Sequence, residues 1–597
     1  MKRKWILHIV FVLFTVYGFS QNSQLAKQYF EDGDFDKALA IYKELYDSQP
    51  YNNTYLTYLV QCYQQLEQYT EAQEVLLHKL DHSGNPIPLT EIDLGYNYLL
   101  QKDSVKATYY FDRTIKYIEM KPEYSGSIGY QFHKYSLLDY ALQAYTKGME
   151  LKPNLNYGYA IATIYGEQGN VEKMFDTLLD LYATNEQQQT KIRRALAQFI
   201  TEEPSNQSNQ LLKKLLLKRT QSAPDTKWNE ILSWLFVQQK QYNMAFIQEK
   251  AIYKRTNEIS LDRLTDLALA ATEDKENATA ISIYNFIIEK SNFNGAILEA
   301  ELAIIKLLSQ ENPVPEKEIE DKFHKLLPEY GMIPQTVQLH IAYAHFIAFQ
   351  KNNPEVASEH LKKLLKLNLS VFDEAAVKME LADILVYDQH FNEALIYYSQ
   401  IQTKLKNDVI GQNAMFKVAQ TSFYKGDFKW AENQLKILKS STSQLIANDA
   451  LQLMLVITDN SQEDSLQTAL KIYAKADLLA YQNKDTEAIK LLDTILTKHK
   501  GESIEDEALY KQAKLYEKAK AYDKAIINYE KMLEFFDGGI LTDDALFALA
   551  TIYEYHLIDT DKAKEYYEKI IFNHQDSIYF VAARKAFRKL RGDNLGS

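Results

Sequence analysis

Two closely spaced histidines are the first residues of this chain whose types and spacing suggest chemistry. His78 and His82 lie four residues apart, with Asp81 between them. On a helix this spacing places both imidazoles on one face, as in pairs of metal ligands. No third ligand is evident, no H-E-x-x-H motif occurs, and the polar turn H-S-G-N-P follows directly. We therefore interpret both as solvent-exposed histidines near a helix end and predict no metal site.

Other signatures of catalysis are missing from the sequence. His340 and His345 are five residues apart and diverge on a helix, so we interpret them as ordinary surface or partly packed residues. There is no G-x-G-x-x-G, no P-loop and no G-x-S-x-G. The carboxylates are abundant, but their spacing does not pair them into a catalytic site. We predict no enzyme activity and no cofactor.

Charge and cysteine content exclude further classes of function. The chain carries 80 acidic and 67 basic residues, a formal net charge of −13, so no overall field attracts a phosphate backbone and nucleic acid is not an expected partner. Two basic clusters, Arg193–Arg194 and Lys213 to Arg219, either meet an anionic partner or are solvated helix faces, the interpretation we favour. The single cysteine, Cys62, excludes an internal disulfide or a cysteine-based zinc site, and its helical context predicts a buried thiol.

The amino terminus has the pattern of an export signal. Three basic residues (2–4) precede an apolar run from Trp5 to Phe19, and the small residues Gly18 and Ser20 precede Gln21. We expect cleavage after Ser20 and export of the mature chain to the periplasm or the outer membrane. The alternative is an uncleaved anchor, for which the run is shorter than the roughly 20 apolar residues that a spanning helix needs. No other run is long and apolar enough to span a membrane.

The elements that position any site are short paired helices, first visible between Leu25 and Pro50. Ala26 and Tyr29 share one helical face, Gly33 interrupts the helix, and a second apolar stripe follows. With only 19 glycines and 12 prolines among 597 residues, the composition provides few tight turns and favours an all-α chain. A chain of this length is too long for a single core, which favours an array of repeated units.

The helix pair recurs at a regular interval. We call the small residue in the middle of each second helix the marker; the first five markers lie 33 to 35 residues apart. A large side chain stands four residues after each of these five, another nine before it, and a mostly small residue twelve before it. The markers are Ala38, Ala72, Ala107, Ala141, Met174, Ala245, Ala280, Ala357, Ala394, Ala431, Ala488, Ala525 and Ala563. Four of the later intervals are 37 or 38 residues, and we attribute the extra residues between Ala357 and Ala431 to longer connecting turns.

This pattern of small and large residues resembles the tetratricopeptide repeat. The resemblance implies a superhelical solenoid of antiparallel helix pairs, with about 14–16 repeats, some of them degenerate. The run from Glu505 to Gly592, with A-L-Y-K-Q-A-K-L-Y-E-K, D-D-A-L-F-A-L-A-T-I-Y and a final A-x3-A-x3-L helix, is similar to periplasmic repeat proteins that organise outer-membrane assembly in Gram-negative bacteria. That likeness implies an envelope scaffold that binds other proteins and leaves the oligomeric state open.

The register divides the chain into segments. We predict a signal peptide (1–20), an amino-terminal repeat segment (21–185), a region of faded register (186–225), a middle repeat segment (226–457) and a carboxy-terminal repeat segment (458–597). The faded region is either a degenerate unit, which we favour, or a hinge. A surplus helix, Ala447 to Ile457, falls in the 57 residues between Ala431 and Ala488. Tyr579 to Leu590 suits a capping helix, with the apolar residues Phe580, Val581, Phe587 and Leu590 alternating with basic ones.

In the repeat family the first helix of each pair lines the concave groove, so the resemblance also implies groove positions. Aromatic residues there suit a bound peptide, because rigid rings bury area at little entropic cost. An alternative function is capture of glycans or nutrients at the cell surface, which one bacterial family performs with embedded repeats. The candidate groove residues are Thr57, Gln61, Gln64, Ile92, Tyr96, Tyr130, His133, Tyr159, Thr163, Tyr510, Lys514, Phe547, Thr551 and Tyr555.

Overall fold

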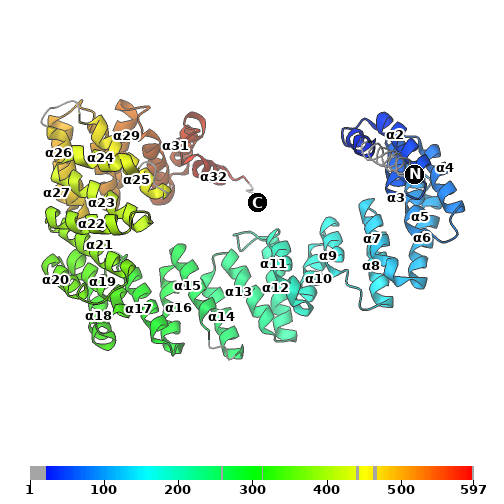
Figure 1. The fold of residues 1–597 in the computed structure, drawn as a ribbon, viewed down its shortest axis with the longest axis horizontal. Helices are drawn as coiled ribbons and strands as arrows, with labels where there is room; N and C mark the ends of the chain where they lie inside the picture. The colour runs from blue at the N-terminus through cyan, green and yellow to red at the C-terminus, as the bar shows by residue number, and fades with distance from the viewer. Residues whose placement is uncertain (1–21, 257–259, 312, 439–442, 462–466, 594–597) are drawn as a thin grey trace, which may run out of the picture. The chain divides into compact units, whose positions relative to one another are not determined.

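The computed structural model describes residues 22–256, 260–311, 313–438, 443–461 and 467–593 (Figure 1). The predicted signal peptide, residues 1–20, lies outside these residues. Every regular element in the described ranges is a helix, which confirms the all-α prediction. No described helix has the length and apolar character needed to cross a membrane. The chain divides into two compact units, Met1–Leu267 and Ala268–Ser597, and this division falls within the predicted middle segment.

Unit 1 consists of consecutive antiparallel helix pairs, each packed on the next. The pairs begin with a helix over residues 22–31. In the region where the sequence register fades, the nine-residue α11 and the 16-residue α12 both pack on α10. The helices are α2 Phe35–Ser48, α3 Asn53–Gln65, α4 Tyr69–Asp81, α5 Pro88–Leu100, α6 Ser104–Met120, α7 Ser125–Lys134, α8 Leu138–Leu151, α9 Gly158–Glu167, α10 Val171–Thr184, α11 Gln189–Ala197, α12 Gln207–Ser222, α13 Thr226–Gln238 and α14 Tyr242–Thr256. The next helix, α15 (Asp262–Glu273), contains the unit boundary.

Unit 2 continues the pairing and adds one helix to it. Two of its first helices end in a π-helical turn, η4 (Phe346–Gln350) and η5 (Ile552–His556). The helices are α16 Asn277–Lys290, α17 Asn294–Leu308, α18 Glu316–Tyr330, α19 Val337–His345, α20 Pro354–Leu364, α21 Val371–Tyr387, α22 Phe391–Lys404, α23 Val409–Lys425, α24 Phe428–Leu438, α25 Gln444–Asp459, α26 Thr468–Tyr481, α27 Asp485–Lys498, α28 Glu505–Lys518, α29 Tyr522–Phe535, α30 Thr542–Thr551, α31 Thr560–Asn573 and α32 Phe580–Arg591.

In every pair that carries a marker, the backbone of the turn between the two helices reproduces the sequence register. One residue of each such turn has a positive φ, and in every case it lies five positions before a marker. The markers are buried, since none is more than 3% exposed. These turn residues are Gly33, Glu67, Lys102, Ser136, Gly169, Lys240, Lys275, Asn352, Gln389, Gly426, Asn483, Lys520 and Ile558. The left-handed residue reverses the chain between the two helices, so the predicted pairing is fixed at the level of single residues.

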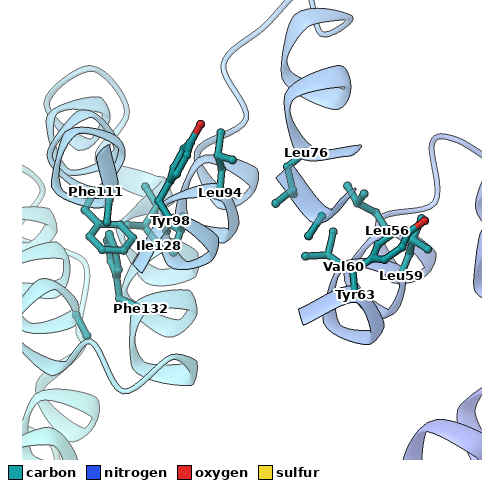
Figure 2. Close-up of a cluster of buried hydrophobic side chains, with 14 of the residues drawn as sticks. Leu56, Leu59, Val60, Tyr63, Leu76, Leu94, Tyr98, Phe111, Ile128 and Phe132 are labelled. Atoms are coloured by element: carbon teal, nitrogen blue, oxygen red, sulfur yellow. The ribbon is translucent and has the colours of Figure 1, made fainter. Parts of the chain in front are cut away.

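Close approach of paired helices explains the small residues of the register. A Cβ added at Gly95 would lie 2.5 Å from the Phe111 ring, and one added at Gly129 would lie 2.6 Å from the Tyr145 ring. Figure 2 shows Phe111 beside Phe132 in this core, and the two ring centroids are 5.5 Å apart. The small residue twelve positions before the marker therefore leaves space on the first helix. The ring four positions after the marker, on the second helix, fills that space.

The two 37-residue intervals between Ala357 and Ala431 do not arise from longer connecting turns, so that prediction was wrong. Two of the first helices, α21 and α23, each contain 17 residues, whereas α3 and α5 contain 13. Adding about one turn to a helix leaves the buried face in register, because a turn is 3.6 residues.

The predicted surplus helix and capping helix are both present, with one correction. The surplus helix is α25, which packs mainly on α24. The cap is α32, which packs on α31, burying Ala583 and partly burying Phe587 and Leu590. Val581, which we expected to belong to the apolar face of the cap, is 76% exposed, because it lies on the opposite side of the helix from Ala583.

Candidate protein-binding surface

The amino-terminal candidate residues lie on first helices of unit 1, but the side chains of several of them already contact other parts of the chain. Gln64 is buried, and its side-chain amide donates to Asn97 Oδ1 at 3.3 Å. Ile92 is fully buried. The hydroxyls of Thr57 and Thr163 donate to carbonyl oxygens of their own helices. Gln61 is half-buried, Thr163 is exposed and Tyr130 is 64% exposed.

Many of these contacts are made between side chains of neighbouring first helices. Tyr96 stacks on Tyr135 with ring centroids 4.0 Å apart, and the Tyr135 hydroxyl donates to Asp93 Oδ1 at 2.7 Å. Burial raises the pKa of Asp93, while the hydrogen bonds from the side chains of Tyr135 and Gln131 lower it. One face of the Tyr96 ring is therefore covered by the chain itself.

Two further bridges extend along the same surface. The imidazole Nε2 of His133 lies 2.8 Å from Glu167 Oε2, and the Lys191 ammonium lies 3.6 Å above the centre of the Tyr159 ring. The candidate groove of unit 1 is thus a surface on which side chains contact one another between repeats.

In unit 2 the candidates Tyr510 and Lys514 line a cavity of about 630 Å³. Its walls come from α23, α25, α26 and α28. Counted from the markers Ala431, Ala488 and Ala525, the residues 15, 11 and 7 positions earlier all line this cavity. The nine residues are Phe416, Gln420, Tyr424, Tyr473, Asp477, Tyr481, Tyr510, Lys514 and Lys518. The cavity is therefore the first-helix groove of three repeats.

The surplus helix α25 forms the remaining wall of the cavity. Asp449, Gln452, Leu453 and Val456 of α25 line it. The far end of α25 is held against the start of α28, where Ser503 Oγ donates to Asn460 Oδ1 at 2.6 Å. A flat groove between repeats has become a pocket at this point because an extra helix lies beside it.

The cavity combines aromatic rings with fixed charges. Lys511 forms an ion pair with Asp477, and Lys518 lies 2.9 Å from Asp485. Burial, reinforced by the Asp477 carboxylate, raises the pKa of the Tyr424 hydroxyl well above its usual range, so this group remains a hydrogen-bond donor. The side chain of Lys514 is 46% exposed, and its nearest carboxylate oxygen, on Glu517, is 3.4 Å away. An apolar side chain accompanied by a carboxylate would find complementary groups here.

The last three candidates lie on α30 and η5. Phe547 stacks on Tyr579 with centroids 4.4 Å apart, and the Tyr579 hydroxyl donates to Asp544 Oδ1 at 2.8 Å. The Thr551 hydroxyl donates to carbonyl oxygens of its own helix. Tyr555 is 58% exposed. In this part of unit 2 the groove again resembles that of unit 1.

The histidines have structural surroundings. His78 and His82 are exposed and stack on each other with centroids 4.1 Å apart. His340 is 2% exposed, so its interpretation as a surface or partly packed residue was wrong. Its Nε2 donates to the Gly331 carbonyl at 3.0 Å, and its Nδ1 accepts from His360 Nε2 at 2.9 Å. The interpretation of solvated basic faces was also wrong for Arg219, which bonds two aspartates of α10.

Seven of the nine groove-position residues that line the cavity were missed by the sequence analysis, although a signal for them was present. Phe416, Tyr473 and Tyr510 occupy the same register position in three successive repeats. The 57-residue interval that contains α25 obscured this recurrence. The aromatic residue 15 positions before the marker was the available signal.

Comparison with known proteins supports the repeat assignment. Residues 29–79, 473–540 and 544–577 each match a family model described as tetratricopeptide repeat. These segments are tetratricopeptide repeats. Such repeats indicate a scaffold for protein–protein interactions, and the cavity lies where part of one matched tetratricopeptide segment meets the inserted helix.

Two solved structures align with most of the chain. One is a chain of the crystal structure of the APC/C hetero-tetramer Cut9–Hcn1, with 14% identity over 90% of this chain and 96% of that chain and a TM-score of 0.25. The other is a chain of the structure of Naa15/Naa10 bound to HypK-THB, with 12% identity over 97% of this chain and 94% of that chain and a TM-score of 0.28. No curated protein matches the sequence.

Proposed function

We propose that this chain is an exported scaffold of the cell envelope that holds a segment of a partner protein in the cavity between α23, α25, α26 and α28. The observation that carries the proposal is the convergence of three groove positions from three repeats on a single cavity. A volume of about 630 Å³ accommodates a few side chains of an extended segment.

The lining supports a peptide rather than a small polar ligand. The rings of Phe416, Tyr473 and Tyr510 offer apolar area at low entropic cost, while the Tyr424 hydroxyl and the Lys514 ammonium offer oriented polar contacts. Lys511 and Lys518 are already paired with aspartates, so Lys514 is the cation best able to meet a carboxylate of the partner.

Position-specific cross-linking in intact source cells tests this proposal. A photoreactive amino acid replaces Gln420 in the cavity or, as a control, the exposed Lys531 on the second helix α29. We expect one protein to be attached reproducibly at position 420 and absent at position 531. Equal attachment at the two positions would contradict the proposal.

A second variant keeps the surface intact but fills the cavity. Gln452→Trp places a large ring at the α25 wall, and Gln143→Trp on the exposed face of α8 is the matched control. Attachment at position 420 should disappear in the first variant and persist in the second. Envelope proteins among the captured partners would support the location, whereas capture of nutrient-uptake proteins would favour the glycan alternative.

Export itself rests on the pattern of residues 1–20. Amino-terminal sequencing of the protein isolated from its source should begin at Gln21. An intact Met1 in a cytoplasmic fraction would exclude export while leaving the binding cavity to be judged by the cross-linking experiment.

A further inference from the structure

Large apolar side chains project from two successive turns near the end of unit 2. Phe535 and Ile540 lie at the α29–α30 turn and are 64% and 66% exposed. Phe572 and Ile578 lie at the α31–α32 turn and are 67% and 85% exposed. We call these four residues the apolar edge. Isolated exposed apolar residues are ordinary, but four at this exposure in two adjoining turns are not.

The two turns lie beside each other. Ser577 Oγ donates to Asp543 Oδ2 at 2.6 Å, which links the α31–α32 turn to the start of α30. The Tyr579 hydroxyl makes the second link, to Asp544 at the same helix start. Since consecutive antiparallel pairs place these turns at the same end of the array, the four apolar side chains project from one edge of the unit.

The helix that follows this edge carries a concentration of positive charge. Arg584, Lys585 and Lys589 of α32 are exposed and form no ion pair with any described residue. Arg588 and Arg591 share the single carboxylate of Asp593. The chain as a whole has a net charge of −13, whereas this helix is positively charged.

The cations and one further apolar residue face outward together. Ala583, Phe587 and Leu590 pack against the rest of unit 2, whereas Val581, 76% exposed, lies on the same outward side as Lys585. The outward face of α32 therefore presents an apolar side chain next to the apolar edge and cations along the next turns.

We infer that the apolar edge and the outward face of α32 together bind the surface of an anionic phospholipid bilayer. Projecting Phe and Ile side chains are suited to the boundary between headgroups and acyl chains, where Lys and Arg side chains meet lipid phosphates. A nucleic-acid backbone would engage the cations but leave the apolar edge in water. An acidic protein segment would need a depression to receive it, and these side chains project instead.

A fluorophore at the edge provides the test. Because the only native cysteine, Cys62, is fully buried, Ile578→Cys can be labelled selectively in the full chain with a polarity-sensitive dye. Val105→Cys on α6, where the native side chain is 81% exposed, is the matched control. We expect the dye at position 578 to move to a less polar environment with vesicles of mixed phosphatidylcholine and phosphatidylglycerol, and the dye at position 105 to remain in water.

The contributions of charge and apolar area are separated by further variants. Reversing Arg584 and Lys585 to Glu in the Ile578→Cys chain should lower the affinity for the anionic vesicles by at least about tenfold, since each cation near such a surface is attracted to it. Reversing Lys213 and Lys214 on α12 should not change it. The inference is overturned if the dye at 578 does not respond to any vesicle, if the dyes at 578 and 105 respond equally, or if only a polyglutamate peptide elicits a response.

Discussion

The first-helix surfaces of the two units follow the same register and differ in what occupies them. In unit 1 groove residues contact side chains of the neighbouring repeat, as in the stack of Tyr96 on Tyr135 and the pair His133–Glu167. In unit 2 the equivalent positions of three repeats open into a cavity. The comparison teaches that repeat spacing determines which residues face the groove, while bridging side chains and inserted helices determine whether the groove is open.

Helix α25 is the main physical difference between the two surfaces. Regular pairs place one first helix directly beside the next, so side chains of ordinary length can bridge them. In unit 2, α25 packs on α24 and contributes Asp449, Gln452 and Leu453 to the cavity wall. An insertion that leaves every marker buried has thus changed the binding surface without changing the repeat.

The largest expected effect tests whether the units are stabilised separately. Ala525→Glu in unit 2 and Ala72→Glu in unit 1 each place a charge where the native side chain is fully buried. We expect each to cost about 3 kcal/mol or more of the unfolding free energy, because no partner is available for the buried carboxylate. Limited proteolysis at increasing urea concentrations provides the measurement. In each variant, the first cleavage sites to appear should lie in the unit that carries the substitution.

Lys518→Glu is the control for this comparison. Lys518 is half exposed and pairs with Asp485, so its loss should cost less than about 1 kcal/mol. If Ala525→Glu and Lys518→Glu shifted the unfolding transition equally, the helix register would be wrong.

Acid should affect unit 2 through the pair formed by the buried His340 and the half-buried His360. Burial lowers the pKa of His360 to about 4 and also lowers that of His340. A base with a lowered pKa binds its proton more readily in the unfolded chain, so the stability it contributes is lost as the pH falls from about 6.5 towards 4. We expect a loss of about 2 kcal/mol across this window.

The variant His360→Gln isolates this effect. Its side-chain amide can still donate to His340 Nδ1, but it does not titrate. Glu507, whose pKa burial raises to about 9, acts in the opposite direction in both proteins and cancels in the difference. If the difference in unfolding free energy between wild type and variant did not change between pH 6.5 and pH 4, the histidine pair would not be the cause.

Gly95→Ala tests the tighter helix contact found in unit 1. The added Cβ would lie 2.5 Å from the buried Phe111 ring, whereas unit 2 accommodates Ala513 together with Tyr529 at the same two register positions. We expect a loss of about 1–2 kcal/mol from overpacking, measured by chemical unfolding. Gly84→Ala, with nothing within 4 Å of the added Cβ, is the control. Equal stability of both variants would mean that the ring moves aside without cost.

Much of the fold could be predicted because the repeat uses local signals. Ala107 and Phe111 lie on one helix face, and Gly95 lies at a fixed sequence spacing before them. The types and spacing of these three residues therefore predicted the packing contact between the two helices. The longer first helices could not be inferred in this way, since an added turn and a longer loop produce the same interval between markers.

The site was harder to predict than the fold. Whether a groove residue is accessible to a ligand depends on side chains that are distant from it in the sequence. Nothing at Gln64 indicates that Asn97 will accept its hydrogen bond, 33 residues away. Tyr510 and Lys514 were placed by register, but the α25 wall beside them comes from an insertion with no register of its own. His340 was misread for the same reason, since its partner His360 lies on the next helix.

The smallest expected effect concerns the turns that both units share. Ile558 has a positive φ of 57° and is 70% exposed, so its β-branched side chain is strained without being packed. Ile558→Gly should raise the unfolding free energy of unit 2 by about 1 kcal/mol, because glycine adopts this conformation without steric cost. Gly169→Ala in unit 1, at the same register position with φ 73°, should lower stability by a similar amount. Thermal unfolding of both variants should show shifts of opposite sign, and shifts of the same sign would mean that the turn residue contributes through its side chain and not through its backbone.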